Sequence, residues 1–214
     1  MRELGSSSIP SMRGGKTKGP DFGTYHHSTP AASEKIRAIM KTTFIDAFAS
    51  LPISREDKLK ILDVGCGLGF LSCVSAEYYK NSSITGIDTF EHVSLKRSSL
   101  GRAKENARIL GFSERINFRN DDLFRFTTVE KFDIIVSNLV FHNLGKRRYQ
   151  AYSSLSSWAK DNSFITIGDL FFWPKTDTGY LSKIFRILRE FKPAIGIRRY
   201  ALYVMLKDPD QVYR

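Results

Sequence analysis

The sequence is poor in the features that mark several specialised protein classes. Cysteine occurs only twice in 214 residues. Cys66 lies in a glycine-rich loop and Cys73 early in the next helix, so no disulfide framework is expected. No uninterrupted apolar run approaches the ~20 residues that cross a bilayer. The first residues, MRELGSSSIPSMRGGKTKGPD, contain no apolar stretch like that of a signal peptide. We therefore expect a reduced, cytoplasmic protein without a membrane partner.

The sequence also lacks the spacing of a metal site. It has four histidines and two cysteines, and no group of them is arranged like a set of metal ligands. The adjacent residues His26 and His27 would need further ligands from distant parts of the chain. No metal site is predicted.

Negative charge is scarce relative to positive charge. The chain has 33 lysines and arginines against 22 aspartates and glutamates, a net charge of +11 with a pI of about 9.7. This balance suits an anionic partner, so nucleic-acid binding is possible. However, the basic residues occur in short scattered groups, with no arginine–glycine repeat and no dense run. We therefore expect the basic surface not to be a nucleic-acid footprint.

The chain does have enough length and apolar content for one buried core. Hydrophobic residues make up 42% of its 214 positions, which suits a single domain. Residues 1–30 are rich in glycine, serine, proline and lysine and are predicted to form a mobile N-terminal arm or lid. Residues 31–214 are predicted to form one domain.

Hydrophobic periodicity predicts that helices and strands alternate. Apolar residues from Ile36 to Phe48 recur at spacings of three and four, which predicts an amphipathic helix that ends before Pro52. The following alternation favours an α/β fold with a doubly wound, mostly parallel sheet covered on both faces. The predicted strands are Leu59–Val64, Ser83–Ile87, Ile116–Arg119, Phe132–Ser137 and Phe164–Ile167. The predicted helices are Phe70–Lys80, Leu95–Leu110 and Lys146–Lys160, with a short turn near Leu123–Val129.

The C-terminal part departs from this rhythm. A basic amphipathic helix is predicted over about Thr178 to Phe191, and the stretch AIGIRRYALYVMLKD after it predicts an antiparallel edge of one or two strands. The apolar side of the helix is expected to pack on the sheet, with docking to a membrane as the alternative.

The stretch KILDVGCGLGFLS, residues 60–72, holds the first candidate site. An apolar strand stops at a loop with the pattern G-x-G-x-G, and a helix follows. In an open parallel sheet, ligands bind beyond the carboxyl ends of the strands where strand order reverses. A nicotinamide fingerprint would need a third glycine where Phe70 stands, and a Walker-type loop would need a lysine that is missing after Gly69. Neither nucleotide motif is therefore predicted.

Three further stretches follow strand ends in the same way. The strand SITGID ends at Asp88, where a carboxylate can accept both hydroxyls of a ribose. Asp121 and Asp122 come directly after INFRN, where a carboxylate and neighbouring amides can meet the amino edge of an adenine. SNLVFHN follows the strand FDIIV on the far side of the same cleft.

Together and in this order, the four stretches resemble the class I S-adenosylmethionine-dependent methyltransferases over about Leu59 to Leu170. The resemblance implies S-adenosylmethionine as cofactor. It implies that Asp63 and the loop surround its methionine part and that Asp88 takes the ribose hydroxyls. The segment from Phe90 to Gly101 is longer than usual for the family and lies near the ribose. The implied cofactor-binding residues are Asp63, Gly65, Cys66, Gly67, Gly69, Asp88, Thr89, Asp121, Asp122 (a better match than Asp121), Leu123 beside the adenine, and Ser137.

Residues beside the expected donor site are candidates for catalysis. Asn138 corresponds to the strand end that faces cofactor and substrate. His142 is either a surface or capping histidine or a substrate contact or base. His27, with its neighbours, either folds over the cofactor as part of a lid or belongs to a disordered arm. Asp169 is expected at the same cleft edge, and residues 171–173, FFW, are expected to line an apolar pocket.

The sequence identifies the donor better than the acceptor. In-line methyl transfer needs alignment and exclusion of water, and a base only where a proton must leave. Because SNLVFHN lacks the Asn/Asp-Pro-Pro-aromatic motif of similar enzymes that methylate nucleobases and glutamine, a small-molecule acceptor is expected. An RNA or protein methyltransferase is the first alternative, and a cofactor-binding regulator without activity is the second. The oligomeric state is open.

Overall fold

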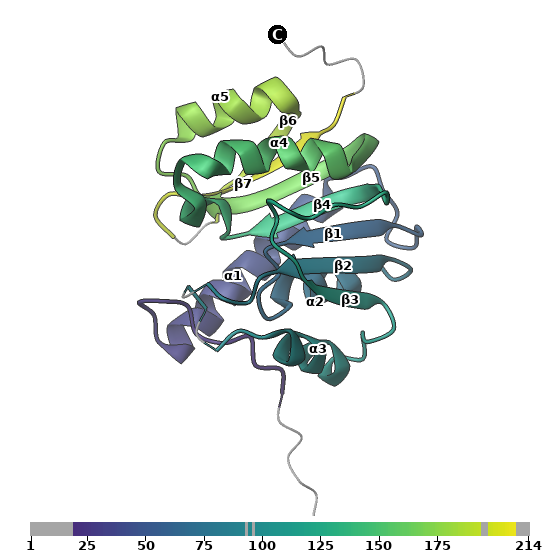
Figure 1. Cartoon of the computed structure of the whole chain (residues 1–214), viewed down its shortest axis with the longest axis vertical. Coiled ribbons are helices and arrows are strands. Elements are labelled where there is room, and N and C mark those ends of the chain that lie inside the picture. The colour runs from purple at the N-terminus through teal and green to yellow at the C-terminus, as the bar shows by residue number, and fades with distance from the viewer. Residues whose placement is uncertain (1–18, 93, 96, 194–196, 209–214) are drawn as a thin grey trace, which may run out of the picture.

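A computed structural model describes residues 19–92, 94–95, 97–193 and 197–208, and Figure 1 shows the whole chain. Its centre is a seven-stranded sheet with the order β3-β2-β1-β4-β5-β7-β6. The first eighteen residues of the predicted arm lie outside the described residues. The strands are β1 Lys60–Val64, β2 Ser83–Asp88, β3 Ile116–Asn120, β4 Phe132–Asn138, β5 Ala159–Leu170, β6 Arg186–Phe191 and β7 Tyr200–Leu206.

Six of these strands run in the same direction, and β7 alone runs the opposite way. β1 pairs in parallel with both β2 and β4, while β7 runs antiparallel to β5 and β6. The chain therefore builds one half of the sheet outward from β1 and then returns to the other side of β1. This confirms the predicted doubly wound, mostly parallel sheet with an antiparallel C-terminal part.

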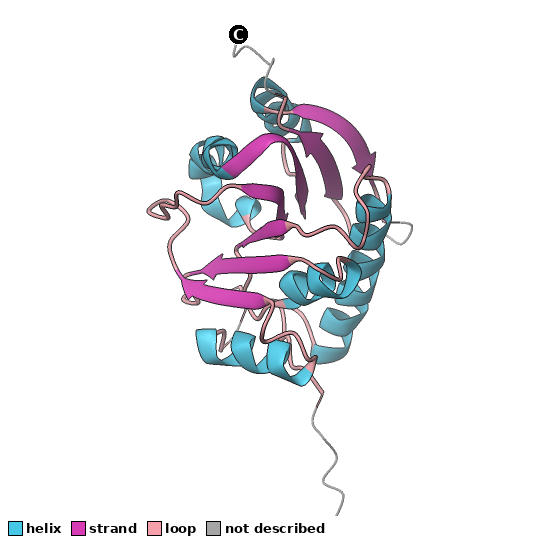
Figure 2. Cartoon of the chain, turned by 90° about the vertical axis from the view of Figure 1, so that its right-hand side faces the viewer, coloured by secondary structure: helices cyan, strands magenta, loops and turns pink. Residues whose placement is uncertain are grey.

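Helices cover both faces of the sheet, as Figure 2 shows. One buried cluster joins α1 and α2 to the sheet, and a second joins α4 and α5 to its other face. The reversal of strand order at β1 leaves the carboxyl ends of β1 and β4 beneath the loops that follow them. The helices are α1 Pro30–Ala49, α2 Phe70–Tyr78, α3 Leu100–Ile109, η1 Phe141–Arg147 (a 3₁₀ segment), α4 Arg148–Trp158 and α5 Pro174–Ile184.

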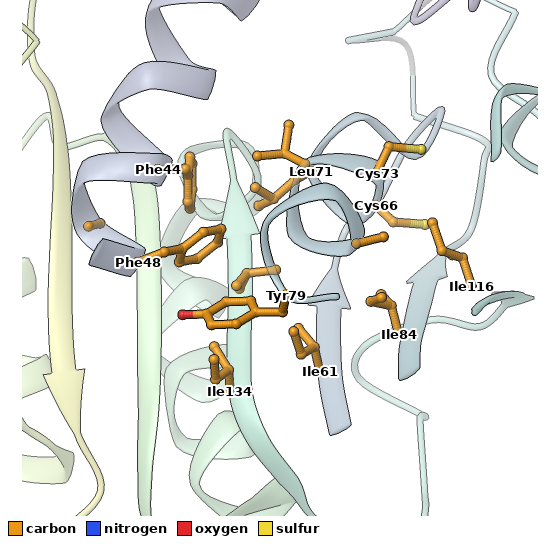
Figure 3. Close-up of a cluster of buried hydrophobic side chains, with 14 of the residues drawn as sticks. Phe44, Phe48, Ile61, Cys66, Leu71, Cys73, Tyr79, Ile84, Ile116 and Ile134 are labelled. Carbon is orange, nitrogen blue, oxygen red and sulfur yellow. The ribbon is translucent and has the colours of Figure 1, made fainter. Parts of the chain in front are cut away.

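The first helix confirms its prediction from apolar periodicity. Thr29 caps its N-terminus by accepting a hydrogen bond from the amide of Ala32 (3.2 Å), and Pro30 occupies the first turn, where no amide donor is needed. Its buried face includes Phe44 and Phe48, which pack with Tyr79 beside the sheet (Figure 3). This contact holds α1 and α2 together on the same face of the sheet.

The C-terminal prediction was partly wrong. The helix predicted to run to Phe191 ends at Ile184, and residues from Arg186 form strand β6. Leu181 and Ile184 already bury the apolar side of the helix, and the backbone of β6 then pairs with β7. The predicted antiparallel strand exists as β7, but it lies inside the sheet and β6 forms the edge.

Other helix boundaries also differ from the prediction. The helix predicted from Leu95 begins at Leu100, because Ser99 accepts a hydrogen bond from the amide of Arg102 and caps it there. The helix predicted from Lys146 is preceded by η1, and Gly145 interrupts the helical backbone at a φ of 54°. Within the described residues, no helix is long and apolar enough to cross a bilayer.

Replacing Phe48 by alanine is expected to lower the free energy of unfolding by about 3–5 kcal/mol, because its fully buried ring contacts Phe44, Tyr78 and Tyr79. Urea denaturation followed by circular dichroism measures the loss. Thr42→Ala, at an exposed position of the same helix, is the control and should change stability by less than about 0.5 kcal/mol. Equal effects of the two substitutions would contradict the packing of α1 described here.

Candidate active site

A cavity of about 660 Å³ opens at the carboxyl ends of the central strands. Its lining comes from the loops after β1, β2, β3 and β4, from α1, and from the segment before α1. Most of the residues singled out from the sequence meet here, although they are far apart in the chain. Those in the lining are His27, Asp63, Gly65, Cys66, Gly67, Asp88, Thr89, Asp121, Asp122, Leu123, Asn138 and His142.

The glycine loop after β1 has a backbone conformation that residues with side chains rarely adopt. Gly65 and Gly67 have φ values of 73° and 51°, in the left-handed region. A Cβ atom on Gly65 would collide with the side chain of Val140, and one on Gly67 would lie 3.0 Å from Leu95. The loop can therefore approach a ligand with its backbone while the neighbouring loops pack against its other side.

Asp88 holds this loop in place. Its Oδ2 accepts a hydrogen bond from the amide of Gly67 (2.9 Å), and its Oδ1 accepts one from the amide of Phe90 (2.6 Å). The carboxylate is half-buried and lines the cavity. Asp88 thus both orders the loop and presents acceptor oxygens beside it.

Asp63 is a buried carboxyl group with one unused oxygen. Its Oδ2 accepts a hydrogen bond from Ser72 (2.6 Å), while Oδ1 has no partner among the described residues. Burial raises the pKa of Asp63 to about 7, against the lowering effect of the Ser72 hydroxyl. A cationic group in the cavity would supply the missing partner and favour the ionised carboxylate.

The two aspartates after β3 are held differently. Asp121 pairs with Arg119 (2.6 Å), and Asp122 accepts a hydrogen bond from the amide of Phe124 (2.9 Å). Both line the cavity with Leu123. The turn that contains them therefore forms the wall beside the end of β2, on the Asp88 side of the glycine loop.

On the opposite wall, Asn138 at the end of β4 is fixed by two groups. Its Oδ1 accepts a hydrogen bond from the hydroxyl of Tyr200 (2.9 Å), and its amide nitrogen lies 3.2 Å from the sulfur of Met40. A Cβ atom on Gly168 would collide with this Tyr200 hydroxyl, so the glycine makes room for the contact. Tyr200 and Met40 were not anticipated from the sequence.

His142 and Asp169 form a close pair at the same wall. His142 Nδ1 lies 2.5 Å from Asp169 Oδ1, and Asp169 is almost fully buried. The carboxylate also accepts hydrogen bonds from the amides of Phe141 (2.7 Å) and Leu170 (2.7 Å). Within the described part of the chain, the other ring nitrogen of His142, Nε2, has no hydrogen-bond partner.

The segment before α1 covers one side of the cavity. Phe22, Tyr25 and His27 contribute to the lining. The segment pairs with the long loop after β2, since Tyr25 bridges to Leu95 and the amide of His26 donates to the carbonyl of Ser94 (2.8 Å). It is also fastened from two helices: Arg37 donates to the carbonyl of Phe22, and the side-chain amide of Asn106 both donates to Asp21 and accepts from it.

Some predicted site residues lie elsewhere. Gly69, at a φ of 82°, is the N-cap residue before α2, and a Cβ atom there would lie 2.6 Å from the ring of Phe118. It is not among the lining residues. Ser137 is buried and donates to the carbonyl of Val64. The expected pocket formed by residues 171–173 is wrong, because Phe171 packs in the core while Phe172 and Trp173 lie on the surface.

Comparison with known proteins decides the family. A family model described as a methyltransferase domain matches residues 55–190. The chain belongs to this family. Its members are class I S-adenosylmethionine-dependent methyltransferases, and S-adenosylmethionine is the cofactor.

Individual relatives differ in what they modify. The chain is 32% identical over 145 residues to a release factor glutamine methyltransferase of Fusobacterium nucleatum, covering 62% of this chain and 38% of that protein. It is 27% identical over 92 residues to a tRNA1(Val) (adenine(37)-N6)-methyltransferase of Vibrio campbellii, covering 43% and 36%. The chain thus spans little more than a third of the length of these two relatives.

The fold is also that of magnesium protoporphyrin IX methyltransferase from Synechocystis PCC 6803, solved with bound S-adenosylmethionine. The TM-score is 0.62 at 18% identity, over 86% of each chain. At this identity the likeness concerns the fold alone. Protein and tRNA substrates among the sequence relatives mean that the family does not specify the acceptor.

The residues present fit the cofactor. S-adenosylmethionine carries an ammonium group that would give Asp63 Oδ1 its missing hydrogen-bond partner. It also carries a ribose whose hydroxyls need an acceptor such as Asp88. The glycine loop provides the close backbone approach between them.

Replacing Asp88 by alanine is expected to weaken the binding of S-adenosylhomocysteine by about tenfold to a hundredfold. Each lost hydrogen bond to a charged acceptor costs ~1.5–3 kcal/mol, and Gly67 loses the carboxylate that orders it. Calorimetric titration measures the affinity. Asp46→Ala, at an exposed position of α1, serves as the control. An unchanged affinity of Asp88→Ala would place the ribose elsewhere.

Binding of S-adenosylhomocysteine at pH 6 is expected to release a proton, and affinity should rise between about pH 5 and pH 8. With its pKa raised to about 7, Asp63 is largely protonated at pH 6, and the ligand's ammonium favours the carboxylate. Titration calorimetry in buffers of different ionisation enthalpy measures the release. It should vanish in Asp63→Asn.

The same raised pKa predicts that the ligand-free protein loses stability as pH rises from about 4 to 7, and Asp63→Asn should flatten this slope.

Proposed function

We propose that the protein transfers the methyl group of S-adenosylmethionine to an acceptor group of small-molecule size that carries a dissociable proton. One observation carries this proposal: a single cavity joins the glycine loop and Asp88 to the pair formed by His142 and Asp169. Donor-binding groups on one wall and a histidine on the other are the parts that such a reaction needs.

Binding and alignment of the donor are assigned to the wall formed by β1 and β2. Asp63 and Asp88 would hold the two polar ends of the cofactor, with the loop backbone between them. Bound S-adenosylmethionine supplies a methyl carbon activated by positive sulfur, so the protein has mainly to align the acceptor and exclude water. Correct alignment is worth up to ~7–11 kcal/mol. The segment from Phe22 to His27, paired with the loop after β2, is positioned to act as the predicted lid.

Removal of the acceptor's proton is assigned to His142. A hydrogen bond from Nδ1 to Asp169 fixes the tautomer in which Nε2 carries the lone pair. Nε2 can then accept a proton as the acceptor atom attacks the methyl carbon, and Asp169 stabilises the imidazolium that forms. The amide of Asn138, fixed by Tyr200, is positioned to hold the acceptor beside it.

The cavity restricts the size of the group that is methylated, and apolar residues in its lining favour a partly apolar group. They include Ile36, Met40, Leu170 and Ile197. A free small molecule, the acceptor expected from the sequence, satisfies these conditions. A nucleobase that belongs to an RNA satisfies them as well, and is favoured by the tRNA-modifying relative and by the net charge of +11.

The proposal is tested by incubating the protein with methyl-labelled donor and a cell extract separated into small molecules, RNA and protein. Label should enter one fraction. Asp169→Asn should lower the rate of methyl transfer into that fraction by about a hundredfold, because general base catalysis contributes about 10²–10⁴-fold to a rate. Affinity for S-adenosylhomocysteine should stay within about twofold.

Asp161→Asn provides the matched control, since Asp161 is an exposed carboxylate on the same strand, paired with Lys207. Thermal unfolding of both variants separates a catalytic effect from a loss of folded protein. Absence of label from every fraction would favour a cofactor-binding regulator. If Asp169→Asn transfers the methyl group at the full rate, the assignment of His142 as general base is wrong.

A further inference from the structure

A surface outside the cavity carries exposed aromatic rings. Phe172 and Trp173 follow the end of β5, and their side chains are 42% and 61% exposed. Tyr180 on α5 is 41% exposed. Two adjacent large rings that face solvent are unusual unless they meet a partner, because burying each would stabilise the fold.

These rings belong to one connected surface, which we call the aromatic strip: Phe172, Trp173, Tyr149 and Tyr180. The ring centroids of Phe172 and Trp173 are 6.1 Å apart, and those of Tyr149 and Tyr180 are 4.4 Å apart and stacked. The guanidinium of Arg148 joins the two halves, since it lies over both Trp173 (5.3 Å) and Tyr149 (4.3 Å). Its residues come from the segment after β5 and from helices α4 and α5, which lie side by side in Figure 1.

Cations accompany the strip at both ends. The guanidinium of the exposed Arg199 lies 5.1 Å from the ring centroid of Phe172, and Lys183 Nζ lies 5.9 Å from that of Tyr180. Arg148 is buried and neutralised by Asp177 (2.7 Å), so it positions rings rather than adding free charge. Rings interleaved with exposed cations form the surface.

The surrounding chain is strongly basic. Over residues 171–199 there are seven basic residues and two acidic ones, and one of the acidic pair, Asp177, is buried against Arg148. Basic groups that look scattered along the sequence thus include a set carried by the elements around the strip. The basic residues in this range are Lys175, Lys183, Arg186, Arg189, Lys192, Arg198 and Arg199.

The strip begins at the cavity. The ring of Phe172 lies 6.5 Å from the ring of His142, which lines the cavity. Leu170 and Ile197 also line it. Leu170 stands two residues before Phe172, and Ile197 stands two residues before Arg199, the cation beside that ring. A hydrogen bond from the amide of Phe171 to the carbonyl of Arg199 (2.9 Å) holds these two segments together. A molecule on the strip can therefore reach into the cavity past His142.

We propose that the aromatic strip binds single-stranded nucleic acid, with bases stacked on Trp173 and Phe172 and phosphates near Arg199 and Lys183. This inference rests on the proposed function and deepens it: the acceptor group is a nucleobase, and the strip holds its neighbouring nucleotides. Aromatic rings beside a positively charged track are the elements that bind unpaired bases, since every base has a face that can stack.

Other partners fit the surface less well. An acidic peptide would meet the cations but has no regular planar groups for the rings. A membrane-docking helix exposes aliphatic side chains, whereas Leu181 and Ile184 of α5 are buried and its large exposed hydrophobic residue is Tyr180. The alternative of membrane docking that the sequence left open is therefore not favoured by the side chains of α5.

Tryptophan fluorescence gives a direct test, because the chain has two tryptophans and Trp158 is buried. Titration of the full chain with a 12-nucleotide oligouridylate at 50 mM salt is expected to quench Trp173. Anisotropy of the same oligonucleotide with a fluorescent label then measures variants. Trp173→Ala should weaken binding about tenfold, and Arg199→Ala should lower the slope of log affinity against log salt by about one.

Matched controls come from the opposite end of the sheet. Arg55 lies over the ring of Tyr78 (4.6 Å) before β1, so Arg55→Ala removes a comparable exposed cation far from the strip, and Val129→Ala removes an exposed apolar side chain. Both should bind like the unmodified chain. S-adenosylhomocysteine titration of every variant reports on the donor site separately. If the unmodified chain does not bind S-adenosylhomocysteine, the result contradicts the proposed function and leaves the strip proposal standing.

Several results would overturn the proposal. One is absence of quenching by the oligonucleotide. Another is equal binding of a 12-base-pair duplex, whose bases cannot stack on side chains, together with no effect of Trp173→Ala. Poly-glutamate that binds as tightly as the oligonucleotide would point to an acidic protein. Binding to phosphatidylglycerol vesicles without binding to the oligonucleotide would point to a membrane.

Discussion

The reversal of strand order at β1 is the constraint on which the site depends. Because β2 and β4 lie on either side of β1, the loops after these strands leave in different directions and a cavity remains between them. The chain crosses this gap through a loop whose glycines take left-handed backbone angles, and Asp88 of the neighbouring strand holds the amide of Gly67. The groups to which we assign donor binding therefore come from the half of the sheet built first.

The other wall depends on a second carboxylate. Asp169, the second-last residue of β5, accepts hydrogen bonds from the amides that begin η1 and holds the ring of His142. One buried group thus sets both the path of the chain after β4 and the tautomer of the histidine. The same strand end continues to Phe172, so the candidate base and the aromatic strip share one support. Under the proposed function, the cavity limits the size of the acceptor group, and the aromatic strip binds the nucleotides next to it.

The sequence predicts best what is encoded locally. The strand, glycine loop and helix from Lys60 to Tyr78 are adjacent in the chain, and each has its own signal in apolar pattern or glycine spacing. The pairing of Tyr25 with Leu95, and of His142 with Asp169, joins residues 70 and 27 positions apart, and no periodicity marks such contacts. Strand β6 was missed because Arg186–Phe191 continues the apolar stripe of the helix before it. Its strand character comes from pairing with β7.

The place of β7 has a consequence for how the chain is made. Tyr200–Leu206 fills the position between β5 and β6, so the side of β5 that faces away from β4 stays unpaired until these residues leave the ribosome. Up to that moment the nascent domain exposes a long apolar strand edge, Phe164 to Leu170, of the kind that recruits other chains. Completion of the hairpin of β6 and β7 closes this edge in one step. Synthesis that stops before Tyr200 therefore leaves an aggregation-prone product, even though every loop of the donor site has already been translated.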